Sequence, residues 1–215
     1  MSKDAWPLFG IRVGTPRIEL RYVDDELAFE LANLATRGVH DPTFMPFAVP
    51  WTDAEPEMLV SNTLKFYWNC RAQTEPNHWT LPFAVIEQGV VIGSSALNAD
   101  DFPILRQFET GSWLGREYQG RGLGRELREA TLHLGFLGLG ARLAITGAYA
   151  DNPPSLGVTR SLGYLPNGSG RKLRRGQAAT HLDFELAVDD WATRLQRDDI
   201  SIVGVEPCLQ FLDLR

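Results

Sequence analysis

The stretch Gln119-Gly120-Arg121-Gly122-Leu123-Gly124 decides how this chain is interpreted. It follows Thr110–Leu114, which is typical of a short strand, and it opens Leu123–Leu137, whose apolar residues recur at helical spacing. Three glycines let the backbone turn tightly and approach a ligand closely. Because the first amides of a helix are unpaired and favour an anion, a pyrophosphate is the expected occupant. A turn that needs glycine only for its geometry is the alternative explanation.

Two other nucleotide-binding motifs do not fit these residues. A Walker A loop ends in Gly-Lys-Ser or Gly-Lys-Thr, and the chain contains neither tripeptide. A dinucleotide-binding fingerprint needs glycine or alanine three positions after its second glycine, where this chain has Arg125 or Leu127. A nicotinamide-dependent enzyme on another α/β fold is therefore disfavoured.

Strands and helices are predicted to alternate after residue 80, a pattern typical of an α/β layer rather than a helix bundle. Asp53 is predicted to cap an early helix that carries Leu59, Thr63 and Phe66 on one side, and residues 100–107 are predicted to form a loop. The other expected elements are strands at 18–22, 83–86, 90–96, 110–114, 143–149 and 181–186, and helices that begin near Asp24, Leu123 and Asn152.

The composition indicates a soluble globular protein. The chain has 215 residues, 44% of them hydrophobic, and a net charge of −6, which argues against nucleic-acid and anionic-membrane partners. Cys70 and Cys208 lie far apart and without metal-ligand spacing, so we expect neither a disulfide nor a metal site. Residues Met1–Trp6 lack the pattern of a signal peptide, and no stretch is long enough to span a membrane. A cytoplasmic location is predicted.

Several separated motifs occur in a fixed order around the glycine-rich turn. They are Thr15-Pro16-Arg17-Ile18-Glu19-Leu20-Arg21, Gly111-Ser112-Trp113-Leu114-Gly115, Asn152-Pro153-Pro154-Ser155 with Leu162-Gly163-Tyr164, and a closing strand Asp183–Leu186 with Asp190-Trp191. Together with Gln119-x-x-Gly122-x-Gly124, they make roughly residues 8–191 resemble the GNAT N-acyltransferases, most closely the RimJ/RimL branch. Residues 1–215 are thus expected to form a single domain, with 192–215 as a C-terminal extension.

The resemblance implies the GNAT fold, an α/β (α+β) architecture. Its central mixed, mostly antiparallel sheet contains two splayed parallel strands, here 110–114 and 143–149, and is flanked by helices. The pantetheine arm of acetyl-CoA lies in the splay, with backbone amides of Trp113 and Leu114 facing the thioester and amides of 119–125 around the pyrophosphate. The expected cofactor-binding residues are Trp113, Leu114, Gln119, Gly120, Arg121, Gly122, Leu123, Gly124, Arg125, Asn152 and Ser155.

The same resemblance suggests two catalytic residues. Ser155 is the candidate proton donor to the leaving thiolate, because Thr159 stands where many members of the family have a tyrosine acid. A capping hydroxyl is the alternative role of Ser155. Glu109 is the candidate base that acts on the amine, and a solvated strand-edge carboxylate is its alternative role. Asn152 could bind a pantetheine amide, cap the following helix, or do both.

The acceptor pocket is expected at the aromatic loop 38–52, through His40, Phe44, Phe47 and Trp51. A loop that only closes the edge of the core fits the same residues. The basic run Arg171–Arg175 is better explained as a solvated hairpin than as a site for an acidic acceptor. The tail after residue 192 could add a strand, a lid or a subunit contact.

The predicted function is an N-acyltransferase that moves an acetyl group from acetyl-CoA to a primary amine. The amine would belong to a protein N-terminus, a lysine or a small molecule. An N-succinyltransferase that uses succinyl-CoA and a non-catalytic acyl-CoA-binding module are the alternatives. A homodimer is expected from the resemblance.

Overall fold

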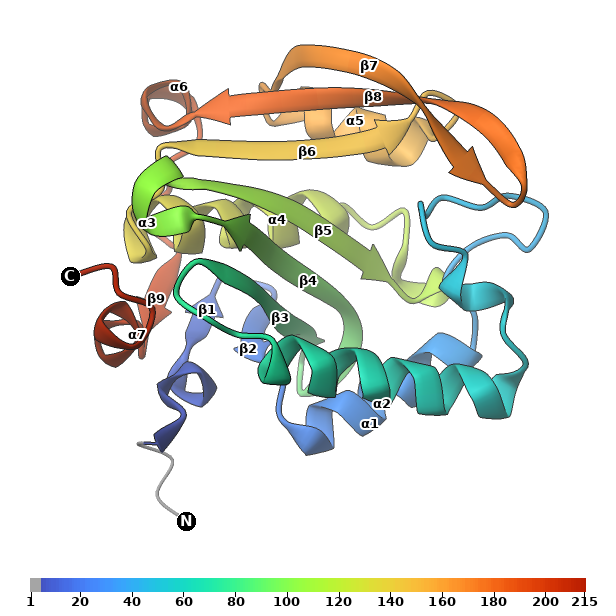
Figure 1. The fold of residues 1–215 in the computed structure, drawn as a ribbon, viewed down its shortest axis with the longest axis horizontal. Helices are drawn as coiled ribbons and strands as arrows, with labels where there is room; N and C mark the ends of the chain where they lie inside the picture. Colours follow the sequence, from blue (N-terminus) through green and yellow to red (C-terminus); the bar gives the residue numbers. More distant parts are fainter. Residues whose placement is uncertain (1–4) are drawn as a thin grey trace.

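The computed structural model describes residues 5–215 and contains a nine-stranded sheet in the order β7-β8-β6-β5-β4-β3-β2-β1-β9 (Figure 1). Of the segment Met1–Trp6, on which the signal-peptide prediction rests, residues 1–4 lie outside the described residues. The strands are β1 Arg12–Gly14, β2 Glu19–Tyr22, β3 His78–Glu87, β4 Val90–Asp100, β5 Gln107–Leu114, β6 Leu143–Tyr149, β7 Leu165–Arg174, β8 Gln177–Ala187 and β9 Ser201–Val203. The expected GNAT-type sheet is confirmed.

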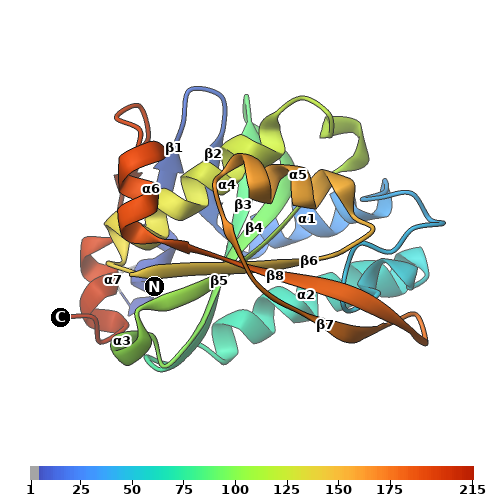
Figure 2. The ribbon, with the colours of Figure 1, turned by 90° about the horizontal axis from the view of Figure 1, so that it is seen from above.

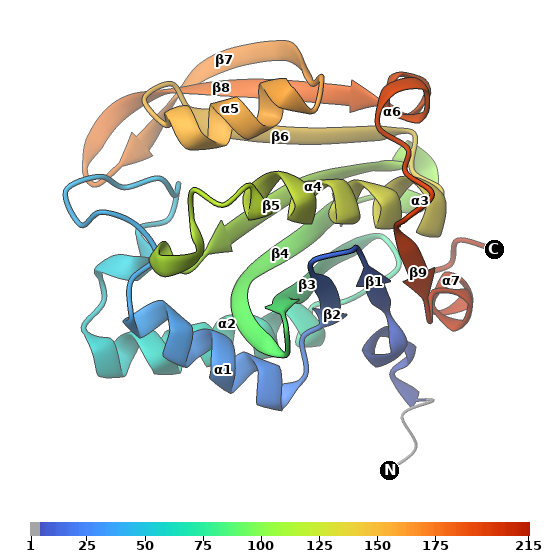
Figure 3. The ribbon, with the colours of Figure 1, turned by 180° about the vertical axis from the view of Figure 1, so that it is seen from behind.

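Helices cover both faces of the sheet, as Figures 2 and 3 show. They are α1 Asp25–Thr36, α2 Pro56–Ala72, α3 Phe102–Leu105, α4 Leu123–His133, α5 Pro153–Ser161, α6 Val188–Arg194 and α7 Glu206–Phe211. On β3, Phe83 and Val85 join the core cluster that includes α4, whereas Ala84 and Ile86 join the one under α1 and α2. This alternation is what a strand buried on both faces requires.

Strands β5 and β6 form the one parallel pairing found among residues 5–215. Their register is limited to Gln107 with Leu143, Phe108 with Ala144, and Glu109 with Ile145. Both strands stay bonded on their outer sides, β5 to β4 as far as Leu114 and β6 to β8 as far as Tyr149. The sheet therefore opens between them while each strand remains fixed.

The beginning of α2 differs from the prediction. The helix begins at Pro56, behind Glu55, whose side chain makes no capping bond, so the prediction of Asp53 as the cap was wrong. Asp53 instead ends the short 3₁₀ turn Trp51–Asp53 and bonds to Arg175. Phe66 is 52% exposed because the buried face runs through Leu59, Thr63, Tyr67 and Cys70, and Phe66 falls one position short of it.

Two further segments correct the sequence-based assignment. The predicted loop 100–107 contains the short helix α3, anchored by the fully buried Phe102. The helix predicted to reach Leu137 is α-helical only to His133 and continues as a π-helical turn over Leu134–Gly138. That turn leaves Leu137 exposed and brings Phe136 against Phe108 with ring centroids 5.6 Å apart.

The C-terminal extension adds a strand to the sheet. Strand β9 pairs antiparallel with β1, through Val203 with Arg12 and Ser201 with Gly14. Helix α7 follows, and Phe211 packs edge-on against Trp6. Of the three possibilities left open by the sequence, the structure shows the extra strand.

We expect Gly135→Ala to lower the melting temperature. A methyl group at this position in the π-helical turn would overlap the ring of Phe108 on β5. Overpacking of this kind costs about 1–3 kcal/mol. In a chain of this size, each kcal/mol lowers the melting temperature by roughly 2–4 °C.

The matched control is Gly157→Ala in α5, where an added methyl group meets nothing within 4 Å. It should raise stability by about 0.5–1 kcal/mol, because alanine is the better helix former. Equal shifts for the two variants in thermal denaturation would contradict the close approach at Gly135.

Candidate active site

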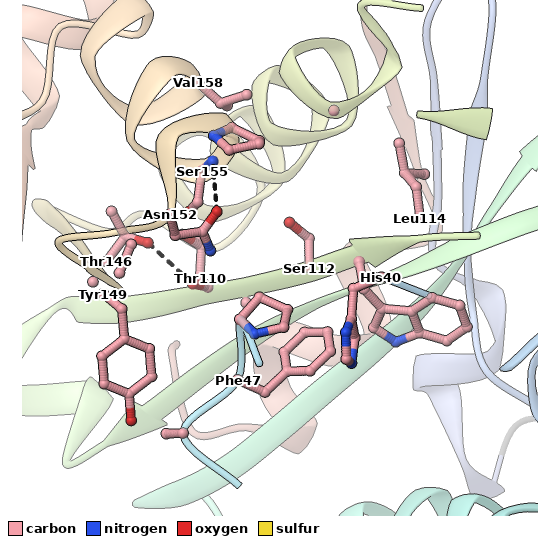
Figure 4. A pocket seen from close by; sticks show the side chains of 18 of the residues that line it. His40, Phe47, Thr110, Ser112, Leu114, Thr146, Tyr149, Asn152, Ser155 and Val158 are labelled. Atoms are coloured by element: carbon pink, nitrogen blue, oxygen red, sulfur yellow. Dashed lines mark hydrogen bonds between the residues drawn. The ribbon is translucent and has the colours of Figure 1, made fainter. Parts of the chain in front are cut away.

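A cavity of about 550 Å³ occupies the opening between β5 and β6. Figure 4 shows Asn152 and Ser155 on the side of the sheet that carries α4 and α5, and His40, Phe47 and Tyr149 on the opposite side. The cavity is therefore lined from both faces, and a ligand on one side can meet a ligand on the other between the separated strands.

The bonding of β5 shows which backbone groups face the opening. The amide of Gly115 donates to Ile92 O, towards β4, whereas Thr110 O accepts a bond from Thr146 Oγ1 of β6. Because alternate residues of a strand direct their N–H and C=O groups to the same edge, Ser112 and Leu114 face the opening. The same alternation directs the amide of Trp113 towards β4. The amide of Ser112 therefore replaces the predicted amide of Trp113, beside that of Leu114, as a donor to a ligand in the opening.

The glycine-rich turn leaves the N-terminus of α4 open. Gly120 and Gly122 have φ angles of +74° and +79°, which glycine adopts without the cost that a side chain would add. Gly122 is the N-cap residue and supplies no side chain to the first amides of the helix. Arg17 fixes the turn by donating from Nη2 to Arg121 O at 3.1 Å. Unpaired amides at the positive end of a helix dipole form a site for an anion.

Gln119 connects the turn to the two sides of the cavity. Its Nε2 donates to Val39 O at 2.6 Å and to Leu114 O at 2.9 Å. The carboxamide is thereby committed to holding the aromatic loop against the end of β5. Of the predicted cofactor-binding residues, those that line the cavity are Trp113, Leu114, Gln119, Gly124, Asn152 and Ser155; Gly120, Arg121, Gly122, Leu123 and Arg125 form the turn and first helical residues beside it.

Helix α5 begins at the open end of β6. Asn152 Oδ1 accepts a bond from the amide of Ser155 at 3.3 Å, which confirms Asn152 as the N-cap. Ser155 lines the cavity. Thr159, at the position of the tyrosine acid in many relatives, is 1% exposed and is not among the lining residues. The structure thus leaves Ser155 as the hydroxyl of α5 that reaches the cavity.

The aromatic loop forms the opposite side. His40, Phe44 and Phe47 line the cavity. The imidazole of His40 is edge-on to the ring of Phe47, with centroids 5.6 Å apart, and its Nε2 lies 2.6 Å from Thr52 Oγ1. Trp51 stands behind them and contacts Phe47 and Trp113 at centroid distances of 5.4 and 5.6 Å. The structure brings the four predicted acceptor residues together, three of them at the cavity wall.

Two arginines of the basic run hold this loop in place. Arg174 donates from Nη1 to Met45 O at 3.4 Å and pairs with Asp151 through two 2.7 Å bonds. Arg175 donates from Nη1 to Pro42 O at 3.1 Å and from Nε to Asp53 at 2.8 Å. Hydrogen bonds from these guanidinium groups hold the pKa values of both carboxyls below their usual range. The pairs therefore persist at neutral pH and are lost only as the pH falls through those lowered values. The basic run thus lies in an exposed β7–β8 hairpin, as predicted, and its last two arginines in addition bond to neighbouring segments.

The structure adds a histidine that the sequence analysis missed. Predicted Glu109 is exposed and lines the cavity, as does His181, which is 7% exposed. Nδ1 of His181 lies 2.9 Å from Asp183 Oδ1, and its ring packs on Gly147, where any side chain would overlap it. The spacing His181-x-Asp183 in a strand was the available signal, because it places both side chains on one face.

A buried arginine lies at the closed end of the opening. Arg128 of α4 is 6% exposed, lines the cavity, and donates from Nη1 to Thr146 Oγ1 at 3.1 Å. Its Nε has no hydrogen-bond partner in the described part of the chain, and the same holds for Thr110 Oγ1 and Tyr164 Oη. Nothing in the sequence pattern singles out Arg128, because it falls within an ordinary helical repeat.

A separated parallel pair beside an uncapped helix N-terminus defines an N-acyltransferase site of the type that uses acyl-CoA. A family profile described as Acetyltransferase (GNAT) domain matches residues 17–165, so the chain belongs to this family of N-acetyltransferases. Within residues 5–215, no helix combines the length and the apolarity that crossing a bilayer requires.

Solved structures with the same fold include proteins of the RimL type. RimL, a ribosomal L7/L12 alpha-N-protein acetyltransferase in complex with coenzyme A, is 18% identical, with a TM-score of 0.69 over 82% of this chain and 97% of that chain. A spermidine N-acetyltransferase SpeG chimera from Vibrio cholerae and hSSAT is 17% identical, with a TM-score of 0.67 over 83% and 99%. The microcin C7 self-immunity acetyltransferase MccE, in complex with acetyl-CoA and AMP, is 16% identical, with a TM-score of 0.63 over 80% and 93%.

Proposed function

We propose that this chain transfers an acetyl group from acetyl-CoA to a primary amine by direct attack of the amine on the thioester. The observation that carries the proposal is the opening between β5 and β6, with the uncapped N-terminus of α4 on one side and the aromatic loop on the other. The pyrophosphate would bind at the amides of 122–125, and the pantetheine arm would extend along the free edge of β5 as an added strand.

In the proposed reaction the amine nitrogen attacks the thioester carbonyl carbon. The amide of Ser112, which faces the opening, stabilises the oxyanion that forms, and the amide of Leu114, two residues further along the same edge, is left to bond the pantetheine arm. The carbon–sulfur bond then breaks, and the Ser155 hydroxyl donates a hydrogen bond to the departing thiolate, which takes up a proton from solvent. The amine loses its proton to a base on the loop side of the sheet.

Two groups compete for the role of the base. Glu109 is a carboxylate on β5 that lines the cavity. His181 lines it too, and the Asp183 carboxylate at Nδ1 orients the ring so that Nε2 is left as the acceptor of a proton. The carboxylate partner and the close packing on Gly147 favour His181, because a base must be held in one geometry to act.

The acceptor belongs to one of three classes: a protein N-terminus, a lysine or a small amine. The structural relatives span this range, since one is a protein alpha-N-acetyltransferase and another a spermidine N-acetyltransferase. A cytoplasmic location, predicted from the sequence, and a homodimer, which the resemblance implies, are part of the proposal. The exposed side chains of Met58, Phe66 and Trp68 on α2 offer apolar area for such a contact.

The binding test compares acetyl-CoA, free CoA and NAD in thermal denaturation. A ligand at about a hundred times its dissociation constant adds about 2.7 kcal/mol of stability. In a chain of this size, each kcal/mol raises the melting temperature by roughly 2–4 °C. Both CoA compounds should raise the melting temperature and NAD should not. The proposal fails if no CoA compound shifts the transition at saturating concentration.

Ser155→Ala tests whether the chain turns over its ligand. Loss of the hydroxyl that stabilises the departing thiolate should lower kcat by on the order of a hundredfold while the affinity for acetyl-CoA is retained. The backbone amide that Asn152 caps remains in this variant, so the start of α5 is preserved. An unchanged rate would remove Ser155 from the mechanism, and a wild type that binds CoA without turnover on any amine would indicate a binding module.

His181→Gln and Glu109→Gln separate the two candidate bases. We expect His181→Gln to lower kcat by about 10²–10³ near neutral pH, with the dissociation constant of acetyl-CoA unchanged. The defect should shrink as the pH approaches the ordinary pKa of an alkyl amine, about 10.4, because the acceptor is then neutral without help. A loss confined to Glu109→Gln would assign the base to Glu109.

A further inference from the structure

Arg128 is a charged side chain that the reaction proposed above does not use. It lies in the second turn of α4, is 6% exposed, and reaches the cavity at its closed end. A guanidinium remains charged in a protein, so its burial carries a large desolvation cost unless an anion or a full set of acceptors compensates for it.

No carboxylate in the described part of the chain lies within salt-bridge distance of Arg128, because the nearby acids have other partners. Glu129 pairs with Arg125 at 2.9 Å and with Arg197 at 2.5 Å. Glu126 pairs with Arg17 at 3.4 Å and accepts a bond from Thr15 at 2.7 Å. Arg128 is left with one bond, to the hydroxyl of Thr146, and with an unpaired Nε.

Two more polar groups without partners belong to the same corner. Thr110 Oγ1 and Tyr164 Oη are buried and make no hydrogen bond within residues 5–215. Burial raises the pKa of Tyr164, whereas the charge of Arg128 and weak polar contacts with Thr110 and Arg128, which fall short of full hydrogen bonds, oppose that shift, so the three side chains lie close together around the phenol oxygen. Both hydroxyls stay protonated at neutral pH and can donate. A cluster of unsatisfied donors in an otherwise apolar core is suited to an anion.

The corner lies where the far end of an acyl chain would reach. Thr110 and Thr146 are the first residues beyond the last pair of β5 and β6, Glu109 with Ile145. The amide of Ser112, proposed to hold the thioester oxygen, lies two residues further along β5, about 6.6 Å away at ordinary strand spacing. An acyl chain that points from the thioester towards the closed end therefore ends beside Arg128.

We propose that Arg128, with Thr110 and Tyr164, forms a subsite for a carboxylate at the end of the acyl chain. The chain then accepts an acyl-CoA of the dicarboxylic type, such as succinyl-CoA, in addition to acetyl-CoA. The planar guanidinium supplies the paired donors that a carboxylate needs, and the buried charge gains its missing counter-ion. This inference rests on the proposed function, because it concerns the donor of the same reaction.

The test compares succinyl-CoA with butyryl-CoA, which has the same number of acyl carbons and a methyl group in place of the carboxylate. Dissociation constants are measured by calorimetry, and kcat/KM is measured with one amine, for the wild type and for Arg128→Met. The wild type should prefer succinyl-CoA by about ten- to hundredfold, as expected for charge-assisted bonds in a buried site. Arg128→Met should abolish or reverse that preference and leave the affinity for acetyl-CoA within a few-fold.

Arg160→Met is the matched control, an exposed arginine on the neighbouring helix α5, and it should keep the preference. Arg128→Lys keeps a positive charge without the planar fork and should retain part of the preference. If Arg128→Met does not fold, the preference of the wild type and of Arg128→Lys for succinyl-CoA over butyryl-CoA still tests the subsite. Equal binding of the two esters by the wild type, or a preference untouched in the Arg128 variants, would overturn the subsite. Failure of the wild type to bind any CoA ester would overturn the proposed function itself, and the subsite with it.

Discussion

The early end of pairing between β5 and β6 is the constraint on which the rest of the site depends. After Glu109 and Ile145 the two strands share no further backbone register, yet β4 and β8 hold each of them on the outer side. The separation is bridged once, where Thr146 Oγ1 donates to Thr110 O and accepts from Arg128. These two side-chain hydrogen bonds lie where the next backbone bonds between β5 and β6 would form. The opening therefore begins at Thr110 and Thr146.

An internal opening of this kind leaves backbone groups that need partners. Unpaired strand edges attract other strands, and proteins usually cover them. Here the free edge of β5 runs towards the open N-terminus of α4, so one extended ligand with an anionic end can satisfy both. The aromatic loop meets the same edge from the other face, held by bonds from Arg174 to Met45 O and from Arg175 to Pro42 O. In the reaction proposed above, the two substrates would approach from opposite sides of one sheet without competing for the same wall.

Much of this arrangement could be predicted from the sequence, where the local signals were strong. Strand β6 was predicted with its exact bounds, Leu143–Tyr149, and Asp24 and Asn152 cap their helices as expected. The glycine-rich turn was informative because few backbones need left-handed glycines directly before a helix. Each of these features is determined by residues close together in the sequence, and a sequence pattern can therefore predict it.

The features that were missed depend on contacts between distant segments. Asp53 was assigned to a helix cap on local grounds, but its partner, Arg175, lies 122 positions away. The π-helical turn after His133 sets Gly135 directly against Phe108, a contact that no helical repeat reveals. Arg128 looked like one more charged residue of a helix, and only the strand opening beneath it shows that its head group is buried.

Gln119 shows how such distant contacts give a familiar motif its physical meaning. The glycines of the signature shape the turn, but its glutamine sends both bonds away from it, to Val39 O and to Leu114 O. A carboxamide nitrogen has two donors and no charge, so it can join two buried carbonyls where a lysine would bring a charge into the site and a leucine would leave both unpaired. The side chain thereby fixes the aromatic loop and the end of β5 relative to the glycine-rich turn. The proposed acyl transfer depends on that connection, because its donor and acceptor would have to meet within the same opening.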